Sequence, residues 1–129
     1  MNTENANAKL NEITGAIIGA AQCVSGTLGC GFLEKVYENA LALELRSRGH
    51  GVAQQKAIDV RYREEIVGEY MADLIVDGRI VVELKAISCL EAAHKAQCLN
   101  YLRATGMRLA ILLNFGRPKL EVRRIVSGY

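Results

Sequence analysis

The strongest constraint on how this chain can fold is a change in the spacing of its apolar residues near Gly51. Before that point, apolar residues recur at helical spacing over 8–27 and over 32–48, with Gly49 just past the second segment. After it come three segments rich in β-branched residues and separated by turn-like sequences, which predict a meander of three antiparallel strands. Those segments are 54–62, 66–76 and 79–87.

The C-terminal part of the chain continues with one helix and two strands. Helical spacing returns over 90–105 and ends near Gly106, after which 109–114 is a short apolar run typical of a buried strand. A last strand is predicted over 119–126. Because a helix connects the third strand to the next one, the order predicts an α/β (α+β) fold in which helices flank a mixed β-sheet.

Length and composition indicate a single domain over 1–129. Half of the residues are hydrophobic, which is more than a disordered chain would contain. No stretch approaches the roughly 18 consecutive apolar residues of a membrane span, and the polar first ten residues lack the apolar core of a signal peptide. We therefore expect a cytoplasmic protein without membrane contact. Its four cysteines form no C-x-x-C pair, so we expect reduced, mostly buried thiols.

The small net charge of +2 conceals an uneven distribution. Residues 51–102 carry six basic and eight acidic side chains, a net charge of −2, whereas 103–129 have a net charge of +5. A basic C-terminal end can attract phosphate groups, although an ordinary solvated face also accounts for it. Its six basic residues, opposed by Glu121 alone, are Arg103, Arg108, Arg117, Lys119, Arg123 and Arg124.

Charged residues interrupt an otherwise apolar hairpin over 72–85. Asp73, Glu83 and Lys85 stand where the pattern of buried strands calls for hydrophobic residues. Two carboxylates on neighbouring strands form an oxygen site suited to Mg²⁺ or Mn²⁺. A lysine beside them can orient or help to deprotonate an attacking water, which is the chemistry of metal-assisted phosphodiester hydrolysis. The alternative is a Glu83–Lys85 ion pair that protects an exposed edge strand.

The loop of this hairpin decides whether the two carboxylates can meet. A two-residue turn at Asp77 and Gly78 would pair 76 with 79 and place Asp73 and Glu83 on opposite faces of the sheet. A shared metal site therefore requires a loop of odd length, such as a three-residue turn, or a bulge in one strand.

Two predicted helices carry polar residues that could reach the same place. On a helical wheel of the second helix, Glu34 lies at the edge of the apolar stripe and Glu44 lies within it. His94, Gln97 and Tyr101 follow one face of the third helix. There Gln97 could position a phosphate or a water, and Tyr101 could donate to the backbone. The alternative is the rim of a helix docked on the sheet, with His94 in solvent.

These residues resemble the pattern of the PD-(D/E)XK nuclease superfamily, in which an aspartate precedes an E-x-K strand and a glutamine follows on a helix. More narrowly, the G-x-x-E-x-x-Y spacing of Gly31, Glu34 and Tyr37 is similar to the signature of the GxxExxY family. Matches extend over about 13–126. The others are Gln55, Gly68-Glu-Tyr70-Met-Ala-Asp73, Val82-Glu-Leu-Lys85-Ala86, His94, Gln97, Asn100-Tyr101-Leu102 and Leu113-Asn114-Phe115-Gly116.

The resemblance implies a restriction-endonuclease-like core and a role for each matching residue. Asp73 and Glu83 would be the metal carboxylates, with the Leu84 carbonyl as a third oxygen ligand. Lys85 would be the catalytic lysine. Glu34 would take an additional acidic position beside the metal, and Gln97 the glutamine position of related exonucleases. Ala72 stands where the superfamily name has its proline.

Together these observations predict a Mg²⁺- or Mn²⁺-dependent nuclease that acts on DNA. The residues expected to contact nucleic acid are His94, Tyr101, Arg117, Lys119, Arg123 and Arg124. Two alternatives stay open: a non-cleaving nucleic-acid-binding or regulatory module on the same fold, and a structural or oligomeric partner protein. A homodimer is compatible with so short a chain, in which case the first helix either supplies the interface or is covered by the sheet.

Overall fold

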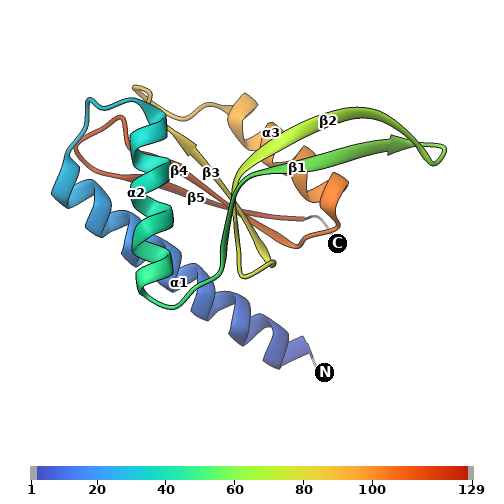
Figure 1. Cartoon of the computed structure of the whole chain (residues 1–129), viewed down its shortest axis with the longest axis horizontal. Helices are drawn as coiled ribbons and strands as arrows, with labels where there is room; N and C mark the ends of the chain where they lie inside the picture. The colour runs from blue at the N-terminus through green and yellow to red at the C-terminus, as the bar shows by residue number, and fades with distance from the viewer. Residues whose placement is uncertain (1–2, 128–129) are drawn as a thin grey trace.

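A computed structural model describes residues 3–127 as one five-stranded sheet with helices on both faces (Figure 1). The strands lie in the order β1-β2-β3-β4-β5, and only the β3–β4 pair is parallel. This confirms the predicted α/β fold with a mixed sheet. The elements are α1 (Thr3–Leu28), α2 (Glu34–Ser47), β1 (Val52–Tyr62), β2 (Glu65–Val76), β3 (Ile80–Lys85), α3 (Ala92–Thr105), β4 (Leu109–Asn114) and β5 (Glu121–Val126).

The sheet separates two apolar layers. Helices α1 and α2 cover one face, where Ile17 and Leu41 pack in the same core as Leu84 of β3. Helix α3 covers the other face, where Leu102 packs in a second core with Val81. Because side chains alternate along a strand, β3 sends its even-numbered residues toward α1 and α2 and its odd-numbered residues toward α3.

The ends of some helices and strands differ from the sequence prediction where polar residues show neither helical spacing nor strand alternation. Helix α1 begins at Thr3, five residues before the predicted start, because its polar first turns bear no apolar stripe to detect. Ile13 and Ile17 are fully buried, so this helix is covered by the rest of the fold. This agrees with the alternative in which the sheet covers the first helix. Strand β3 ends at Lys85 instead of 87, and β5 begins at Glu121 instead of 119.

The expectation of mostly buried thiols is wrong for three of the four cysteines. Cys23, Cys30 and Cys89 are exposed free thiols, and only Cys98 is buried. Burial in the α3 layer raises the pKa of Cys98 to about 12, so this thiol stays protonated. Within residues 3–127, no helix is long and apolar enough to cross a membrane.

The β2–β3 hairpin has a loop of three residues, as the metal-site hypothesis required. Val76 pairs with Ile80, so the loop consists of Asp77, Gly78 and Arg79. Asp77 and Gly78 both adopt left-handed backbone conformations, with φ of 53° and 66°. In this register 73 and 83 fall opposite each other, and both carboxylates can meet at the sheet.

A second irregularity reverses the faces of β1 and β2. Gln55 has a φ of +50°, and the β1–β2 pairing omits Gln55 and Asp73 between two regular stretches. Beyond this point Ile58 and Ala72 face the α3 layer, whereas Leu74 on the near side belongs to the α1–α2 layer. The outer half of the hairpin therefore packs beside α3, and in Figure 1 it extends away from the rest of the sheet.

The chain after β3 is clamped by β4 through a buried asparagine. Asn114 is fully buried, and its side chain accepts hydrogen bonds from the backbone N–H of Ile87 and Gly116, each at 3.0 Å. Its amide donates to the Ile87 carbonyl at 3.0 Å. Gly116 lies so close to Ala86 and Ile87 that a Cβ there would overlap their backbone atoms. This close approach fixes the segment that leaves Lys85.

Gly116→Ala is therefore expected to destabilise the fold by at least about 3 kcal/mol, because rigid backbone would have to move. Gly15→Ala is the matched control. Gly15 lies inside α1 with open space around its Cβ position, so this change should add about 0.5–1 kcal/mol of stability. Chemical denaturation of both variants measures the two effects. A stability loss of less than 1 kcal/mol for Gly116→Ala would contradict the close approach.

Candidate active site

Asp73 and Glu83 interlock β2 and β3 where the regular pairing of these strands stops. The last regular pair is Leu74 with Val82. Beyond it, the Asp73 N–H donates to Glu83 Oε1 at 3.2 Å, and the Leu84 N–H donates to Asp73 Oδ2 at 2.9 Å. Each carboxylate thus takes the place of a backbone acceptor of the ladder. The Asp73 side chain therefore bonds to β3 and the Glu83 side chain to β2, so the two predicted residues meet.

Burial and mutual repulsion make this pair of carboxylates unfavourable when both are ionised. Glu83 is 3% exposed. Burial, and then the nearby charge of Asp73, raise the pKa of Glu83 to about 9, against which the charge of Lys85 acts only in part. The metal-free protein therefore holds Glu83 protonated at neutral pH.

The donor set fits a hard divalent cation. The two carboxylates, which meet at this point, supply oxygen ligands only, which is what Mg²⁺ and Mn²⁺ prefer. Among residues 3–127, no three His, Cys, Asp or Glu side chains gather closely enough to hold a metal ion by themselves. Mg²⁺ sites commonly use one or two carboxylates and complete the shell with water and substrate phosphate, so a pair is sufficient. A bound cation would also relieve the repulsion between Asp73 and Glu83.

Glu34 and Lys85 lie close enough to this pair to act on it electrostatically. Glu34 is the first residue of α2, and its side chain is largely exposed. Partial burial and the charges of Asp73 and Glu38 raise the pKa of Glu34, while the charge of Lys85 lowers it. Lys85, two residues after Glu83, is half-buried at the end of β3. The structure thus interlocks Asp73 with Glu83 directly, and Glu34 and Lys85 act on this pair through their charges.

Helix α3 contributes a tyrosine to the other side of the carboxylates. Tyr101 is buried, and its pKa is raised to about 12 by burial and by the charges of Glu83 and Asp73. Its hydroxyl donates to the Met71 carbonyl at 3.5 Å, as the sequence suggested, and accepts from Gln97 Nε2 at 3.1 Å. Gln97 is therefore joined to the strand of Asp73 through one hydroxyl group.

His94 has a structural partner at the start of α3. Its Nδ1 accepts a hydrogen bond from the Glu91 N–H at 3.0 Å, and the Glu91 side chain in turn accepts from the His94 N–H. This reciprocal cap satisfies two N–H groups that a helix start leaves free. The ring is half-buried at the rim of the helix.

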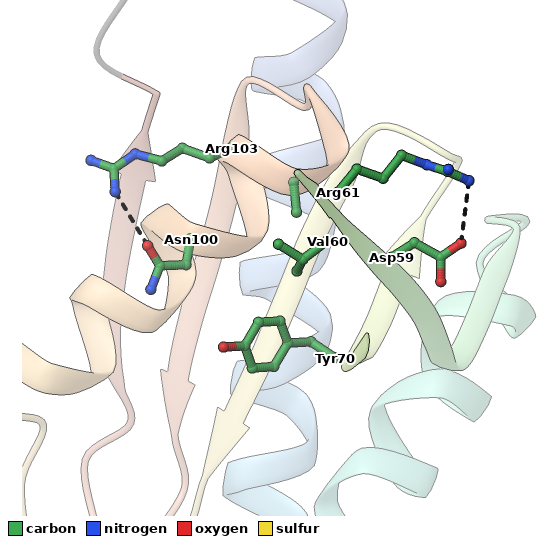
Figure 2. A pocket seen from close by; sticks show the side chains of 7 residues that line it. Asp59, Val60, Arg61, Tyr70, Asn100 and Arg103 are labelled. Atoms are coloured by element: carbon green, nitrogen blue, oxygen red, sulfur yellow. Dashed lines mark hydrogen bonds and ion pairs between the residues drawn. The ribbon is translucent and has the colours of Figure 1, made fainter. Parts of the chain in front are cut away.

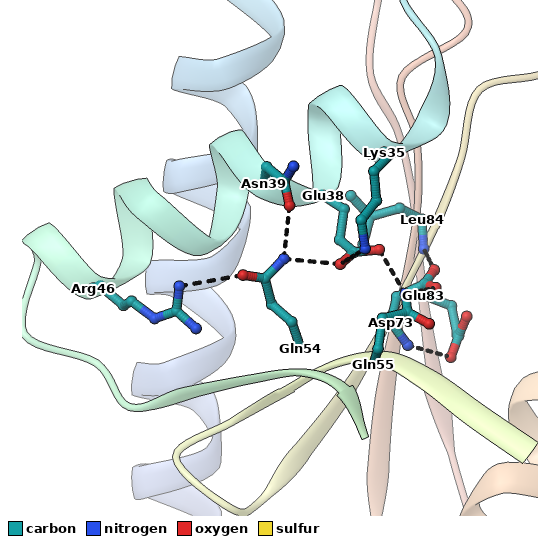
Figure 3. A network of polar contacts seen from close by, with 9 residues as sticks. All are labelled: Lys35, Glu38, Asn39, Arg46, Gln54, Gln55, Asp73, Glu83 and Leu84. Atoms are coloured by element: carbon teal, nitrogen blue, oxygen red, sulfur yellow. Dashed lines mark hydrogen bonds and ion pairs between the residues drawn. The ribbon is translucent and has the colours of Figure 1, made fainter. Parts of the chain in front are cut away.

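The polar network behind Asp73 is the part that sequence reasoning missed (Figure 3). Glu38 of α2 is 3% exposed and accepts hydrogen bonds from both Gln54 and Gln55 of β1. The helical wheel favoured Glu44 as the acid within the apolar stripe, but Glu44 instead pairs with Arg48 at 2.8 Å on the surface. Leu41, Ala42 and Leu45 follow Glu38 at helical spacings and are buried with it on one face of α2. The wheel missed this face because it was centred on Leu33 and Val36, which are exposed.

Comparison with known proteins agrees with this geometry. A model of the PD-(D/E)XK nuclease superfamily matches residues 11–125, nearly the whole chain. The chain belongs to this superfamily. The matched range includes every candidate catalytic residue, from Glu34 to Gln97. Its members generally use divalent metals and act on nucleic acids. No curated protein and no solved structure shows a significant match.

The C-terminal basic residues of this PD-(D/E)XK chain do not form one face. Arg117 and Arg123 both contact the Glu121 carboxylate at 3.6 Å. Arg124 points to the other side of β5, where it donates to Asn11 of α1 at 2.7 Å. Lys119 is exposed in the preceding loop. Two neighbouring arginines on a strand therefore serve opposite faces of the sheet.

A groove between the outer β1–β2 hairpin and α3 adjoins the site (Figure 2). Tyr70 lies in this groove and makes an edge-to-face contact with Tyr101, with ring centroids 5.7 Å apart. Arg61 and Arg103 line its two sides, and Arg103 donates to Asn100 at 3.2 Å. Sequence spacing could not reveal this groove because its lining comes from three separate elements.

Replacement of Glu83 by Gln is expected to stabilise the metal-free protein at neutral and higher pH. The folded-state pKa of about 9 lies above the ordinary value of 4.5, so the wild type loses stability progressively as the pH rises from about 4.5 to 9. Gln keeps the size and the acceptor oxygen but does not ionise. Thermal unfolding in EDTA should show similar stability at pH 5 and a gain of roughly 1–3 kcal/mol for Glu83→Gln at pH 8.

Asp77→Asn serves as the control for this pH series. Burial disfavours the Asp77 charge, but hydrogen bonds from His50 and from the Gly51 N–H hold the pKa of Asp77 below its usual value. Its removal should therefore cost stability above about pH 4 and not produce a gain at pH 8. If Glu83→Gln is instead less stable than the wild type at pH 8, then ionisation of Glu83 does not lower the stability of the wild type, and the prediction is wrong.

Proposed function

We propose that the chain is a Mg²⁺- or Mn²⁺-dependent nuclease that hydrolyses phosphodiester bonds in DNA. The observation that carries this proposal is the interlocked Asp73–Glu83 pair with Lys85 two residues on, in a chain of the nuclease superfamily. A pair of carboxylates with like charges, one of them buried, is costly, and it is retained most readily where a cation uses it.

In this proposal Asp73, Glu83 and the Leu84 carbonyl hold the divalent cation. When bound, the cation supplies Lewis-acid polarisation of the scissile phosphate. Lys85 orients the attacking water and stabilises the negative charge that develops on the phosphate oxygens. Water adds to phosphorus, the bond to the leaving sugar oxygen breaks, and the proton of the water passes to solvent or to the leaving oxygen. Lys85 is thus the catalytic residue whose charge matters most in the transition state.

Glu34 and Gln97 complete the proposed site from the two helix layers. Glu34 lies at the start of α2, where its charge interacts with those of Asp73 and Lys85. In this proposal it accepts a proton, or a hydrogen bond from a water bound to the cation. Gln97 is linked to Tyr101 and positions a phosphate or a water from α3. The Gly31, Glu34 and Tyr37 spacing supports assignment to the GxxExxY family within the superfamily.

Contacts with nucleic acid are proposed on the α3 side and at the C-terminal strand. His94 lies at the rim of α3, and the basic residues of the β4–β5 loop and β5 supply positive charge. Tyr101, also expected to contact nucleic acid, is buried with its hydroxyl bonded to Met71, so it is left out of the proposed contacts. A homodimer is the proposed source of further contacts with a duplex. A DNA substrate agrees with the cytoplasmic location expected from the sequence.

Lys85→Ala should reduce cleavage of plasmid DNA in Mg²⁺ or Mn²⁺ by at least about 100-fold while the protein stays folded. The reason is the loss of the positive charge that stabilises the phosphate oxygens in the transition state. Lys9→Ala is the charge-matched control. Lys9 is exposed on α1, outside the site, so its removal should leave cleavage within about twofold of wild type. Linear, circular and single-stranded DNA distinguish attack at ends from attack within the strand.

Two outcomes separate this proposal from its alternatives. Equal cleavage by the wild type and Asp73→Ala would assign the activity to a contaminating nuclease and contradict the proposal. Salt-sensitive DNA binding without any cleavage, retained in Glu83→Gln, would favour a non-cleaving module on the same fold.

A further inference from the structure

A partly buried chain of polar contacts runs from α2 to Asp73 through β1 (Figure 3). Glu38 Oε2 accepts from Lys35 Nζ at 2.9 Å and from Gln54 Nε2 at 2.8 Å. Glu38 Oε1 accepts from Gln55 Nε2 at 2.7 Å. A buried carboxylate requires such donors, and the Lys35 ammonium balances its charge. Glu38 is therefore a satisfied and firmly held anchor beside the catalytic strands.

Gln55 joins this anchor to the metal-site candidate. The same Nε2 that donates to Glu38 also donates to Asp73 Oδ1, at 3.3 Å. One amide nitrogen thus uses both of its hydrogens on two carboxylates. Because the amide is neutral, the buried anion can orient Asp73 without direct contact between the two negative groups.

The backbone of Gln55 indicates that its side chain is used. Its φ of +50° lies in the left-handed region, where a residue other than glycine is strained by about 1–2 kcal/mol. Glycine would occupy this position without strain. The strain of a glutamine at this position is offset by the two hydrogen bonds that its amide makes.

We propose that Gln55 is a positioning residue for the divalent-cation site and acts through Asp73. The inference rests on the proposed nuclease function. Asp73 Oδ2 is fixed by the Leu84 N–H and Oδ1 by the Gln55 amide, so the carboxylate plane is set before a cation arrives. Each oxygen keeps a further lone pair for the cation. A ligand held in this way loses less freedom on binding, which raises cation affinity.

Gln55→Gly tests this inference with Mn²⁺ as the probe. Glycine removes the amide and also relieves the left-handed strain, so the variant should fold. Electron paramagnetic resonance of free Mn²⁺ measures the affinity of the full chain without any need for substrate. We expect Gln55→Gly to weaken Mn²⁺ binding by about 10–100-fold, which is typical when the partner of a metal ligand is lost.

Gln54→Ala is the matched control, because Gln54 donates to the same carboxylate, at Glu38 Oε2, and to Asn39, and not to Asp73. Its Mn²⁺ affinity should stay within about twofold of wild type. In cleavage assays the apparent Mn²⁺ requirement should rise for Gln55→Gly alone, with activity recovering at high Mn²⁺. A merely structural role would lower activity at every Mn²⁺ concentration.

Three results would overturn the inference. Wild-type Mn²⁺ affinity in Gln55→Gly, or an equal loss in Gln54→Ala, would contradict the positioning role and leave the nuclease proposal standing. Absence of Mn²⁺ binding by the wild type would overturn the nuclease proposal and this inference with it. If Gln55→Gly does not fold, Gln55→Asn replaces it. Asparagine tolerates left-handed backbone, but its amide is one methylene too short to span Glu38 and Asp73, so the same loss is expected.

Discussion

The interlock between Asp73 and Glu83 is the constraint on which the candidate site depends. Each carboxylate replaces a backbone acceptor, so the loss of either side chain would leave a partly buried N–H without its partner. The same two groups end the β2–β3 ladder and collect negative charge at one point of the sheet. The pKa of Glu83 is raised because this carboxyl is buried and, second, because Asp73 lies next to it.

The reversal of faces at Gln55 and Asp73 explains how residues from both helix layers reach this point. A regular β1–β2 hairpin would present one set of side chains to α1 and α2 along its whole length. With the reversal, the near half packs against α2, which carries Glu34, and the outer half packs against α3, which carries Tyr101. The two helices lie on opposite faces of the sheet, yet both border the same pair of carboxylates.

Much of this could be predicted from the sequence, because strand alternation and helical spacing are strong signals in buried segments. The element order followed from local pattern, and strand alternation showed that Asp73 and Glu83 could share a face only with an odd-length loop or a bulge. The structural roles of Gln55 and Glu38 were not predicted. Gln55 was noted only as a match to the family, because its left-handed backbone depends on tertiary packing. Glu38 shares helical spacing with the buried Leu41 and Leu45, but the buried face of this helix was placed at Leu33 and Val36. Three cysteines were misplaced because their exposure also depends on tertiary packing.

The basic C-terminal residues show that a cluster of charges in the sequence need not form one binding surface in the fold. Arg117 and Arg123 both contact Glu121, whose pKa is lowered by the Asn114 side chain, the Leu90 N–H and these two arginines. Asn114 in turn clamps the segment that follows Lys85. These arginines are thus partly engaged in holding the framework of the site. A phosphate that approached Arg117 or Arg123 would have to compete with Glu121 for them, so the +5 charge counted in the sequence overstates what these residues offer to a ligand.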